Sequence, residues 1–336
     1  MHGFGIVGTG IIATTHASAI AAIPGARLVA VTDELPGTAA TFAGRQDCAA
    51  EPDLDALLGR DDIDVVCVCV PSGLHAEVGV RAAEAGKHLV VEKPIDVTLA
   101  AADRLISAAE AAGVLLTVIS QHRFDPGLIE LRRLLDAGAL GDLVFGEATT
   151  KWHRTQAYYD SAAWRGTWAL DGGGALMNQG VHYVDLLRWS MGPAAEVTAI
   201  CATRAHQVEV EDVAAATIRF RSGAVGTLVA STAIFPGLAQ RLEVFGTNGT
   251  VVIEDGQMVQ RAVTGEPEAA PAAAGAGAAA DPADLGVSAH AAQIADLLEA
   301  IDTGREPAVT GANGRDALEI VCAVYESART GRPVVL

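Results

Sequence analysis

The stretch Asp171–Asp185 carries three side chains that can handle protons, at helical spacing. After three consecutive glycines, Asn178, His182 and Asp185 stand at positions i, i+4 and i+7 of a run that we predict to be a helix. This spacing puts an amide, an imidazole and a carboxylate on one helix face. A histidine held in this way can transfer a proton near neutral pH, and the glycines let a ligand approach the backbone. The segment is a candidate for acid–base chemistry; the alternative is a packed helix with a hydrogen-bonded histidine.

A glycine-rich turn near the N-terminus has the pattern of a dinucleotide site. Residues 3–7 read as a buried strand, and the turn leads into a helix that we expect to end near residue 22. Gly8 permits a tight turn, Gly10 lets backbone amides reach a pyrophosphate at the helix N-terminus, and Ala13 allows close packing of helix on strand. The other expected cofactor contacts in this turn are Thr9, Ile11 and Ile12.

Asp33 supports the same interpretation from the next strand. It follows residues 27–32, which read as a strand, and stands near the distance from Gly10 expected for the acid that binds the adenosine ribose. Asp33 and Glu34 would repel a 2′-phosphate, and no arginine follows directly. The sequence therefore favours NAD over NADP and leaves dual use open. A glycine-rich turn without a ligand is the alternative.

Two further loops follow apolar runs that are typical of central parallel strands, residues 64–70 and 88–92. Cofactors lie at the carboxyl ends of such strands. Lys93 stands at one of these ends, where partial desolvation beside a cationic nicotinamide would lower its pKa and suit it to proton transfer; a solvated lysine is the alternative. The expected cofactor contacts in these loops are Pro71, Ser72, Leu74, His75, Glu92 and Lys93.

The polar residues after the strand 114–119 and an aromatic-rich segment complete the candidate site. Gln121 is expected to contact the cofactor and Arg123 the substrate. Residues 151–168 hold three of the four tryptophans, and aromatic faces stack on sugar or nicotinamide rings. Trp164 and Arg165 are therefore predicted substrate contacts, and a packed loop or a subunit contact is the alternative.

The order of the expected elements predicts two domains. Alternating strands and helices over residues 1–120 indicate an α/β domain with a doubly wound parallel sheet. The rest is expected to be an α+β domain with a large, open, mostly antiparallel sheet of about six strands that carries a helix over 174–191. We place the domains at 1–122 and 123–336, with C-terminal helices at about 287–330. The expected strands of the second sheet are 143–153, 194–204, 213–221, 224–234, 240–246 and 250–253.

Composition excludes several classes of partner. The chain has 336 residues and a formal net charge of −18, which argues against nucleic acid and anionic membranes as partners. No apolar run approaches the ~20 residues of a membrane helix. The five cysteines have no zinc-site spacing, so we expect no metal and a reduced, cytoplasmic protein. The first strand begins too near Met1 to leave room for a signal peptide, and residues 262–286 read as a surface loop.

Five motifs in order resemble the Gfo/Idh/MocA family of NAD(P)-dependent oxidoreductases, which includes glucose–fructose oxidoreductase and inositol dehydrogenase. The resemblance runs over essentially the whole chain. It implies a Rossmann domain followed by a substrate domain whose open sheet often mediates oligomers, so we expect a homodimer or homotetramer. The motifs are Gly8-Thr-Gly10-Ile-Ile-Ala13, Pro71-Ser-Gly-Leu-His75, Glu92-Lys93-Pro94, Gly172-Gly-Gly-Ala-Leu-Met-Asn-Gln-Gly-Val-His182 and Gly314-Arg-Asp-Ala-Leu-Glu-Ile320 with Tyr325-Glu-Ser-Ala-Arg329.

The resemblance also implies roles for individual residues. The family's catalytic lysine falls on Lys93 and its catalytic histidine on His182. Many members carry an aspartate four residues before that histidine, where this chain has Asn178. Because asparagine cannot act as a base, Lys93 and His182 are expected to share the proton chemistry, with Asn178 hydrogen-bonding a substrate hydroxyl.

The expected reaction is hydride transfer between a nicotinamide cofactor and a secondary alcohol or ketone of a sugar, cyclitol or nucleotide-sugar derivative. The stretch from Trp164 to Gln179 also resembles members that act on UDP-linked amino-sugar acids. Those anionic substrates need basic contacts, for which Lys151, Arg154, Arg165 and Arg123 are candidates.

Three other functions are weighed against this one. The family includes transcriptional regulators that bind a dinucleotide without turnover, but the retention of Lys93 and His182 favours an enzyme. A glycosidase that uses NAD transiently would release a hydrolysed sugar with no net redox change. A dihydrodiol or biliverdin-type reductase would prefer NADPH, and Asp33 argues against it.

Overall fold

The computed structural model describes residues 1–35, 37–266 and 286–336, and the chain forms two compact units. The first unit comprises Met1–Gln121 and Ala283–Arg315, and the second comprises His122–Pro282 and Asp316–Leu336. The helix α9 (Val287–Thr303), which we expected in the second domain, therefore belongs to the first unit. The physical reason is burial, since Ile294, Leu297 and Leu298 pack into the hydrophobic core of the first unit.

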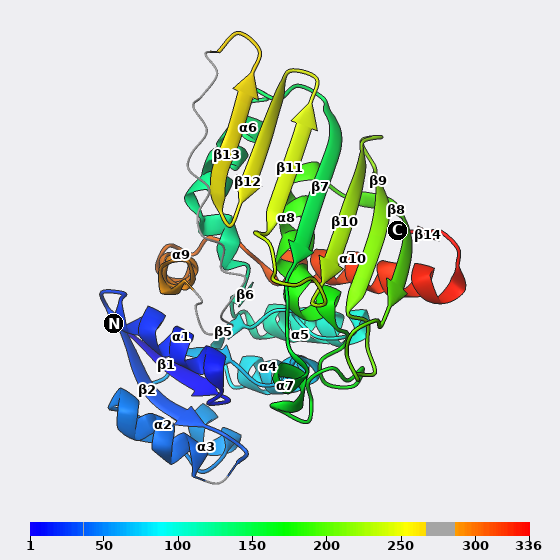
Figure 1. Ribbon diagram of the computed structural model, residues 1–336. Coiled ribbons are helices and arrows are strands. Elements are labelled where there is room, and N and C mark those ends of the chain that lie inside the picture. The colour runs from blue at the N-terminus through cyan, green and yellow to red at the C-terminus, as the bar shows by residue number, and fades with distance from the viewer. Residues whose placement is uncertain (36, 267–285) are drawn as a thin grey trace. The chain divides into compact units, whose positions relative to one another are not determined.

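The first unit is built on a six-stranded parallel sheet in the order β3-β2-β1-β4-β5-β6 (Figure 1). This order confirms the predicted doubly wound fold. Along the chain, the elements are β1 (His2–Val7), α1 (Ile11–Ala21), β2 (Ala26–Thr32), α2 (Thr38–Gln46), β3 (Ala49–Ala50), α3 (Leu54–Leu58), β4 (Val65–Val68), α4 (His75–Glu84), β5 (His88–Val91), α5 (Leu99–Ala112) and β6 (Leu116–Val118).

Two helical layers hold this sheet. One face packs its side chains, Phe4 and Ile6 among them, against α1, α2 and α9. On α4, Gly79 has no room for a side chain because Leu105 of α5 would lie 2.6 Å from its Cβ. Close packing on both faces fixes the carboxyl ends of the strands, where the glycine-rich turn and the polar loops begin.

The second unit is built on an eight-stranded sheet in the order β13-β12-β11-β7-β10-β9-β8-β14. Neighbouring strands are antiparallel except for β7 and β10, which pair in parallel, so the predicted open, mostly antiparallel sheet is confirmed with two strands, β13 and β14, that we did not expect. The strands are β7 (Leu143–Lys151), β8 (Ala194–Ala202), β9 (Val213–Phe220), β10 (Val225–Ser231), β11 (Arg241–Gly246), β12 (Gly249–Glu254), β13 (Gln257–Val263) and β14 (Val334–Val335).

Helices cover one face of this second sheet (Figure 1). These are α6 (Pro126–Asp136), α8 (Val181–Met191) and the later part of α10 (Gly311–Thr330), while the short α7 (Gln156–Asp160) follows β7. Gly146 of β7 lies so close to Met191 of α8 that an added Cβ would be 2.7 Å from that side chain. Its neighbour Phe145 therefore points to the opposite face, where Phe145 and Phe245 form a ring pair at 6.0 Å.

The helix predicted over 174–191 is two elements, which corrects that prediction. Residues Ala175–Gly180 form a π-helix, and α8 begins at Val181. A π-helix has i→i+5 hydrogen bonds and a wider turn than an α-helix. Asn178 therefore does not share one regular α-helical face with His182 and Asp185.

Two remaining expectations concern other parts of the chain. Of the predicted loop 262–286, residues 262–263 end β13, and 267–285 lie outside the described residues. In the part of the chain that the structure describes, no helix has both the length and the apolar character needed to cross a membrane.

Candidate active site

The glycine-rich turn joins β1 to α1 in the first unit. Gly8 has a φ of 89°, and a Cβ there would lie 2.5 Å from the carbonyl oxygen of Cys69, so the fold itself requires this glycine. Gly10 caps the N-terminus of α1, and no described atom would lie within 4 Å of a Cβ added to it. Because protein packing does not explain Gly10, the open space fits the close approach of a pyrophosphate. The expected contacts Ile11 and Ile12 form the first turn of α1.

Asp33 lies directly after β2 and is tied to the glycine-rich turn. Its Oδ2 accepts hydrogen bonds from the backbone amide and the hydroxyl of Thr9, each at 2.7 Å, and its Oδ1 accepts from the amide of Leu35 at 2.9 Å. Burial alone would raise the pKa of Asp33, but the hydrogen bonds from Leu35 and Thr9 outweigh it and lower the pKa. The residue is therefore a carboxylate at neutral pH, as binding to ribose hydroxyls requires.

The loops after β4 and β5 are linked by His75. Its Nδ1 lies 2.7 Å from the carbonyl oxygen of Pro94, and its Nε2 lies 3.0 Å from that of Val70. Burial lowers the pKa of His75 despite these two acceptors. His75 therefore braces the loop that contains Lys93, while Pro71, Ser72 and Leu74, which we also predicted as cofactor contacts, form the turn just before it.

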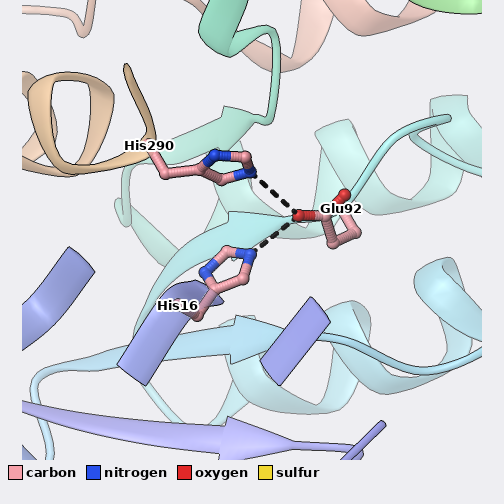
Figure 2. A group of neighbouring side chains, drawn as sticks. All are labelled: His16, Glu92 and His290. Carbon is pink, nitrogen blue, oxygen red and sulfur yellow. Dashed lines mark hydrogen bonds and ion pairs between the residues drawn. The ribbon is translucent and has the colours of Figure 1, made fainter. Parts of the chain in front are cut away.

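Glu92 is the centre of a buried cluster that the sequence analysis did not identify (Figure 2). Its Oε1 lies 2.7 Å from Nε2 of His16 on α1 and 3.8 Å from Nε2 of His290 on α9. Hydrogen bonding with His16 and His290 lowers the pKa of Glu92 well below its usual value, although burial opposes this. The cluster connects α1, the end of β5 and α9 within the first unit.

The cluster is a hydrogen-bonded one and not a preformed metal centre. All three side chains are among the metal-ligating types, and their ligand atoms lie within 4.8 Å of one another. Two ligands of one zinc ion stand about 3.3 Å apart, because each lies about 2.0–2.1 Å from the metal. The distance of 2.7 Å from His16 to Glu92 is that of a hydrogen bond.

Gln121 lies at the end of the first unit and is only 4% exposed. Its Oε1 is buried and has no hydrogen-bond partner among the described residues. A buried acceptor without a partner is costly, so this atom fits a ligand that donates a hydrogen bond, as a nicotinamide carboxamide does. Together with the open approach at Gly10, this atom makes the first unit a good fit for a dinucleotide.

In the second unit, the π-helix and the loop before it form a polar network around Asn178. Its Nδ2 donates to Oδ1 of Asp171 at 2.5 Å, and its Oδ1 accepts from Nε2 of Gln179 at 3.2 Å. Oδ2 of Asp171 accepts from the backbone amide of Gly166 at 2.8 Å. Hydrogen bonds to both its nitrogen and its oxygen therefore fix the orientation of the Asn178 side-chain amide, with the NH₂ group facing the carboxylate of Asp171.

His182 begins the first turn of α8 and packs edge-on against His122, with ring centroids 5.2 Å apart. His122 in turn lies 2.7 Å, through Nδ1, from Oδ2 of Asp125. This contact fixes the face of the His182 ring within the second unit. No sequence pattern linked His182 to His122, because the two come from separate elements.

Arg123, which we expected to bind substrate, forms a buried ion pair with Asp185. Its Nε donates to Oδ2 of Asp185 at 2.8 Å and its Nη2 donates to Oδ1 at 2.5 Å. The guanidinium also lies 5.4 Å from the ring centroid of Trp189. The structure thus gives Arg123 and Asp185 a shared structural role, which joins the start of the second unit to α8.

Arg165 is held differently, by aromatic rings. Its guanidinium lies 4.5 Å from the ring centroid of Tyr158 and 4.6 Å from that of Trp164. Its Nη1 donates to the Tyr158 hydroxyl at 2.7 Å, and its buried Nε has no hydrogen-bond partner among the described residues. The guanidinium of Arg154 lies 4.8 Å from the ring centroid of Trp152 and 5.4 Å from that of Tyr158, the ring that Arg165 also contacts. The aromatic segment therefore presents two stacked guanidinium groups.

The parallel sheet, the glycine-rich turn after its first strand and the acid after its second define the class of NAD-binding oxidoreductases with a dinucleotide-binding domain. Comparison with known families agrees: residues 2–120 match the oxidoreductase family with an NAD-binding Rossmann fold, and residues 128–252 match the GFO/IDH/MocA C-terminal domain. The chain belongs to the Gfo/Idh/MocA family, as the sequence predicted, and its cofactor is NAD.

Individual relatives cover almost the whole chain. Inositol 2-dehydrogenase of Rhizobium meliloti is 29% identical over 98% of both chains, and scyllo-inositol 2-dehydrogenase (NAD(+)) of Bacillus subtilis is 29% identical over 98% of this chain and 95% of that protein. Among solved structures, the WlbA dehydrogenase of Bordetella pertussis in complex with NADH and UDP-GlcNAcA has a TM-score of 0.88 and 30% identity, covering 100% of this chain and 98% of that one.

Proposed function

We propose that the protein is an NAD-dependent dehydrogenase for a secondary alcohol of an anionic sugar derivative, such as a nucleotide-linked sugar acid. The observation that carries the anionic substrate is Arg165, whose guanidinium is held by two aromatic rings and has a buried Nε without a described partner. Arginine suits carboxylate and phosphate because it donates in a planar fork. The bound UDP-GlcNAcA of the Bordetella pertussis relative supports this substrate class.

The neutral alternative is a cyclitol, as the names of the inositol dehydrogenase relatives indicate. The aromatic-held guanidinium of Arg165 favours an anionic substrate over a neutral cyclitol. A non-catalytic sensor is not favoured, since relatives that match nearly the full length are dehydrogenases. The same relatives give no support to an NAD-dependent glycosidase.

We assign the proton chemistry to Lys93 and His182. The residues of the first unit would hold NAD⁺, which would supply the hydride acceptor for the reaction. Lys93 or His182 removes the hydroxyl proton of the substrate as the carbonyl forms, and returns it in the reverse direction. Asn178 hydrogen-bonds a substrate hydroxyl with an amide that Asp171 and Gln179 hold in place.

The remaining roles follow the two units. We assign cofactor binding to residues 1–122, with Asp33 on the adenosine ribose and Gly10 beside the pyrophosphate, and substrate binding to residues 123–336. Contacts to the cofactor are assigned to Gly8, Thr9, Gly10, Ile11, Ile12, Asp33, Pro71, Ser72, Leu74, His75, Glu92, Lys93 and Gln121, and contacts to the substrate to Lys93, Trp164, Arg165, Asn178 and His182.

We also propose a homo-oligomer that pairs through the open face of the second sheet. That face carries Phe145 and Phe245 as well as the exposed Ile200, which is 76% exposed, and Val225, which is 50% exposed. Burying such apolar surface would stabilise a homodimer or homotetramer. The five free cysteines support a reducing, cytoplasmic location.

The deciding experiment measures NADH formation by the purified protein with UDP-linked sugar acids, neutral UDP-sugars, free sugars and inositols. Lys93→Ala and His182→Ala should each lower kcat by ~10²-fold or more, while Lys87→Ala, which removes a lysine bonded to the carbonyls of Arg60 and Ile63, serves as the control. Arg165→Met should raise KM for the acidic sugar by ~10-fold or more, and Arg221→Met on the surface should not. Turnover of inositol alone, unaffected by Arg165→Met, would replace the anionic substrate with a cyclitol.

A further inference from the structure

The start of the π-helix depends on a residue from a distant part of the chain, Glu211. Helix N-termini leave their first backbone N–H groups without intrahelical partners. Here Oε2 of Glu211 accepts from the amide of Gly174 at 2.9 Å, and Oε1 accepts from that of Leu176 at 2.8 Å. The backbone carbonyl of Glu211 accepts from Ala175 at 3.0 Å. Glu211 thus satisfies three consecutive N–H groups at the start of the segment that carries Asn178.

Tyr325 of α10 accepts a hydrogen bond from the next backbone N–H group, that of Met177. The amide of Met177 donates to its hydroxyl at 3.2 Å, and that hydroxyl donates to Oε1 of Glu211 at 3.0 Å. The following amide, of Asn178, already has an intrahelical acceptor, the carbonyl of Gly174, at 3.0 Å. Glu211 and Tyr325 together account for every N–H group from 174 to 177.

This arrangement also explains two of the three glycines that opened the sequence analysis. A Cβ on Gly174 would clash with the backbone carbonyl of Glu211, and a Cβ on Gly173 would clash with the hydroxyl of Tyr325. The glycines therefore allow the protein's own capping groups to approach the backbone. In this chain the close approach at Gly173 and Gly174 is by the protein and not by a ligand, which corrects the initial expectation.

The charge of Glu211 matters because the amides of Gly174 and Leu176 and the hydroxyl of Tyr325 all donate to its side chain. A carboxylate can accept from all of them, whereas the protonated acid must donate its own proton and loses acceptor capacity. Burial raises the pKa of Glu211 to about 7, although the hydrogen bonds from Leu176, Gly174 and Tyr325 oppose the rise. The other titratable groups that interact with it are Cys201 of β8 and Tyr159 of α7.

We propose that Glu211 and Tyr325 are positioning residues for the reaction, which hold the π-helix so that Asn178 and the following His182 keep their orientation. Neither side chain is assigned to substrate or cofactor; each acts through the backbone of residues 174–177. This inference rests on the proposed function, because it gives these two residues a part in the reaction assigned to His182.

The first test needs no substrate. Hydrogen–deuterium exchange of peptides covering 172–182 is compared between the wild type and Glu211→Gln at a single pH. The glutamine side chain places an NH₂ group opposite a backbone N–H, so exchange at 174–177 should be faster by ~10-fold or more. Asp212→Asn is the matched control, because Asp212 is fully buried and bonds the amides of Arg204, Ala205 and His206 instead.

The second test is kinetic. Glu211→Gln should lower kcat by ~10-fold or more with KM for NAD⁺ within about twofold, and Tyr325→Phe should act in the same direction with a smaller effect. Asp212→Asn should lower the melting temperature without this effect on kcat. Unchanged exchange at 174–177 and an unchanged kcat in Glu211→Gln would overturn the inference. Hydrogen exchange does not depend on turnover. If Glu211→Gln exchanges faster at 174–177 but the wild type turns over no substrate, the capping role of Glu211 is supported and the proposed function is contradicted.

Discussion

The carboxylate of Asp33 accepts two hydrogen bonds from Thr9, one from its amide and one from its hydroxyl, both at 2.7 Å. The acid after β2 is thereby attached to the glycine-rich turn after β1, although the two residues are 24 positions apart. These two hydrogen bonds hold the side chains of Thr9 and Asp33 in one arrangement at the carboxyl ends of the adjacent strands β1 and β2. In such folds the adenosine ribose binds there.

Asp33→Asn should weaken NAD⁺ binding and relax the choice of cofactor. The substitution removes a charged acceptor for the ribose hydroxyls, whose loss costs roughly 1.5–3 kcal/mol, so KM for NAD⁺ should rise by ~10-fold or more. It also removes the negative charge that repels a 2′-phosphate. Initial rates with NAD⁺ and NADP⁺ measure the change; an unaltered ratio of kcat/KM for the two cofactors would exclude Asp33 from cofactor selection.

The glycines of the turn should separate folding from binding. Gly8→Ala is strained at a φ of 89° and clashes with Cys69, so it should lower the free energy of unfolding by roughly 1–3 kcal/mol. Gly10→Ala has open space on the protein side and should leave the melting temperature nearly unchanged while weakening NAD⁺ binding. Thermal denaturation and calorimetric titration with NAD⁺ measure the two effects. Equal affinity of Gly10→Ala and the wild type would show that no ligand approaches there.

The sequence predicted the first unit well because its signals are local. The turn from Gly8 to Ala13 lies directly between a strand and a helix, and Asp33 follows the next strand, so a short window of sequence contains these residues. The position of α9 could not be predicted in this way, since its core contacts, Leu297 among them, are made with elements far earlier in the chain. The His16–Glu92 pair, 76 residues apart, had no local signal for the same reason.

The second unit shows where periodicity fails. The run 174–191 has the apolar pattern of an α-helix, but its first part is a π-helix whose start is capped by Glu211 and Tyr325. Both residues come from other elements, so no window of sequence around Asn178 contains them. Arg123 was expected to contact the substrate because it follows a strand; its partner Asp185 stands 62 residues away.

The cluster around Glu92 should make stability depend on acid pH. The pKa of Glu92 in the folded protein lies well below 4.5, so the carboxylate stabilises the fold above that pH, and this contribution is lost as pH falls through the folded pKa. Glu92→Gln should lower the free energy of unfolding at pH 7 by roughly 1–3 kcal/mol and should flatten its fall below pH 4.5. Denaturation midpoints from pH 3 to 7 test this. An equal acid dependence in both proteins would assign the effect to other groups.

Asn178→Asp should not restore the family's aspartate in a working form. The Asn178 amide donates to Asp171 at 2.5 Å, so the variant would place two carboxylates in contact. One of the two carboxyl groups would have a raised pKa, because ionising both at this distance places two like charges in contact. The raised pKa means that stability falls as pH rises, so the melting temperature of the variant relative to wild type should drop further between pH 5 and pH 8. Asn178→Ala is the control, since its deficit should not depend on pH.

Glu211 should give activity and stability opposite dependences on pH. Its pKa is raised to about 7 in the folded protein against an ordinary value of 4.5, so the folded state binds a proton that the unfolded state has lost between these values. The free energy of unfolding contributed by this group therefore falls as pH rises from about 4.5 to about 7 and is level above. Capping of the π-helix requires the carboxylate, so the same rise in pH should increase kcat.

Tyr325→Phe tests that dependence, because the hydrogen bond from Tyr325 lowers the pKa of Glu211. Removing the hydroxyl should move the acid limb of the pH profile of kcat to higher pH, and Glu211→Gln should remove that limb. Neither substitution alters an acid–base group other than Glu211 and Tyr325, so a shift of the limb in Tyr325→Phe would assign the limb to Glu211. An acid limb at the same pH in wild type, Tyr325→Phe and Glu211→Gln would assign the limb to another group and remove the pH role of Glu211.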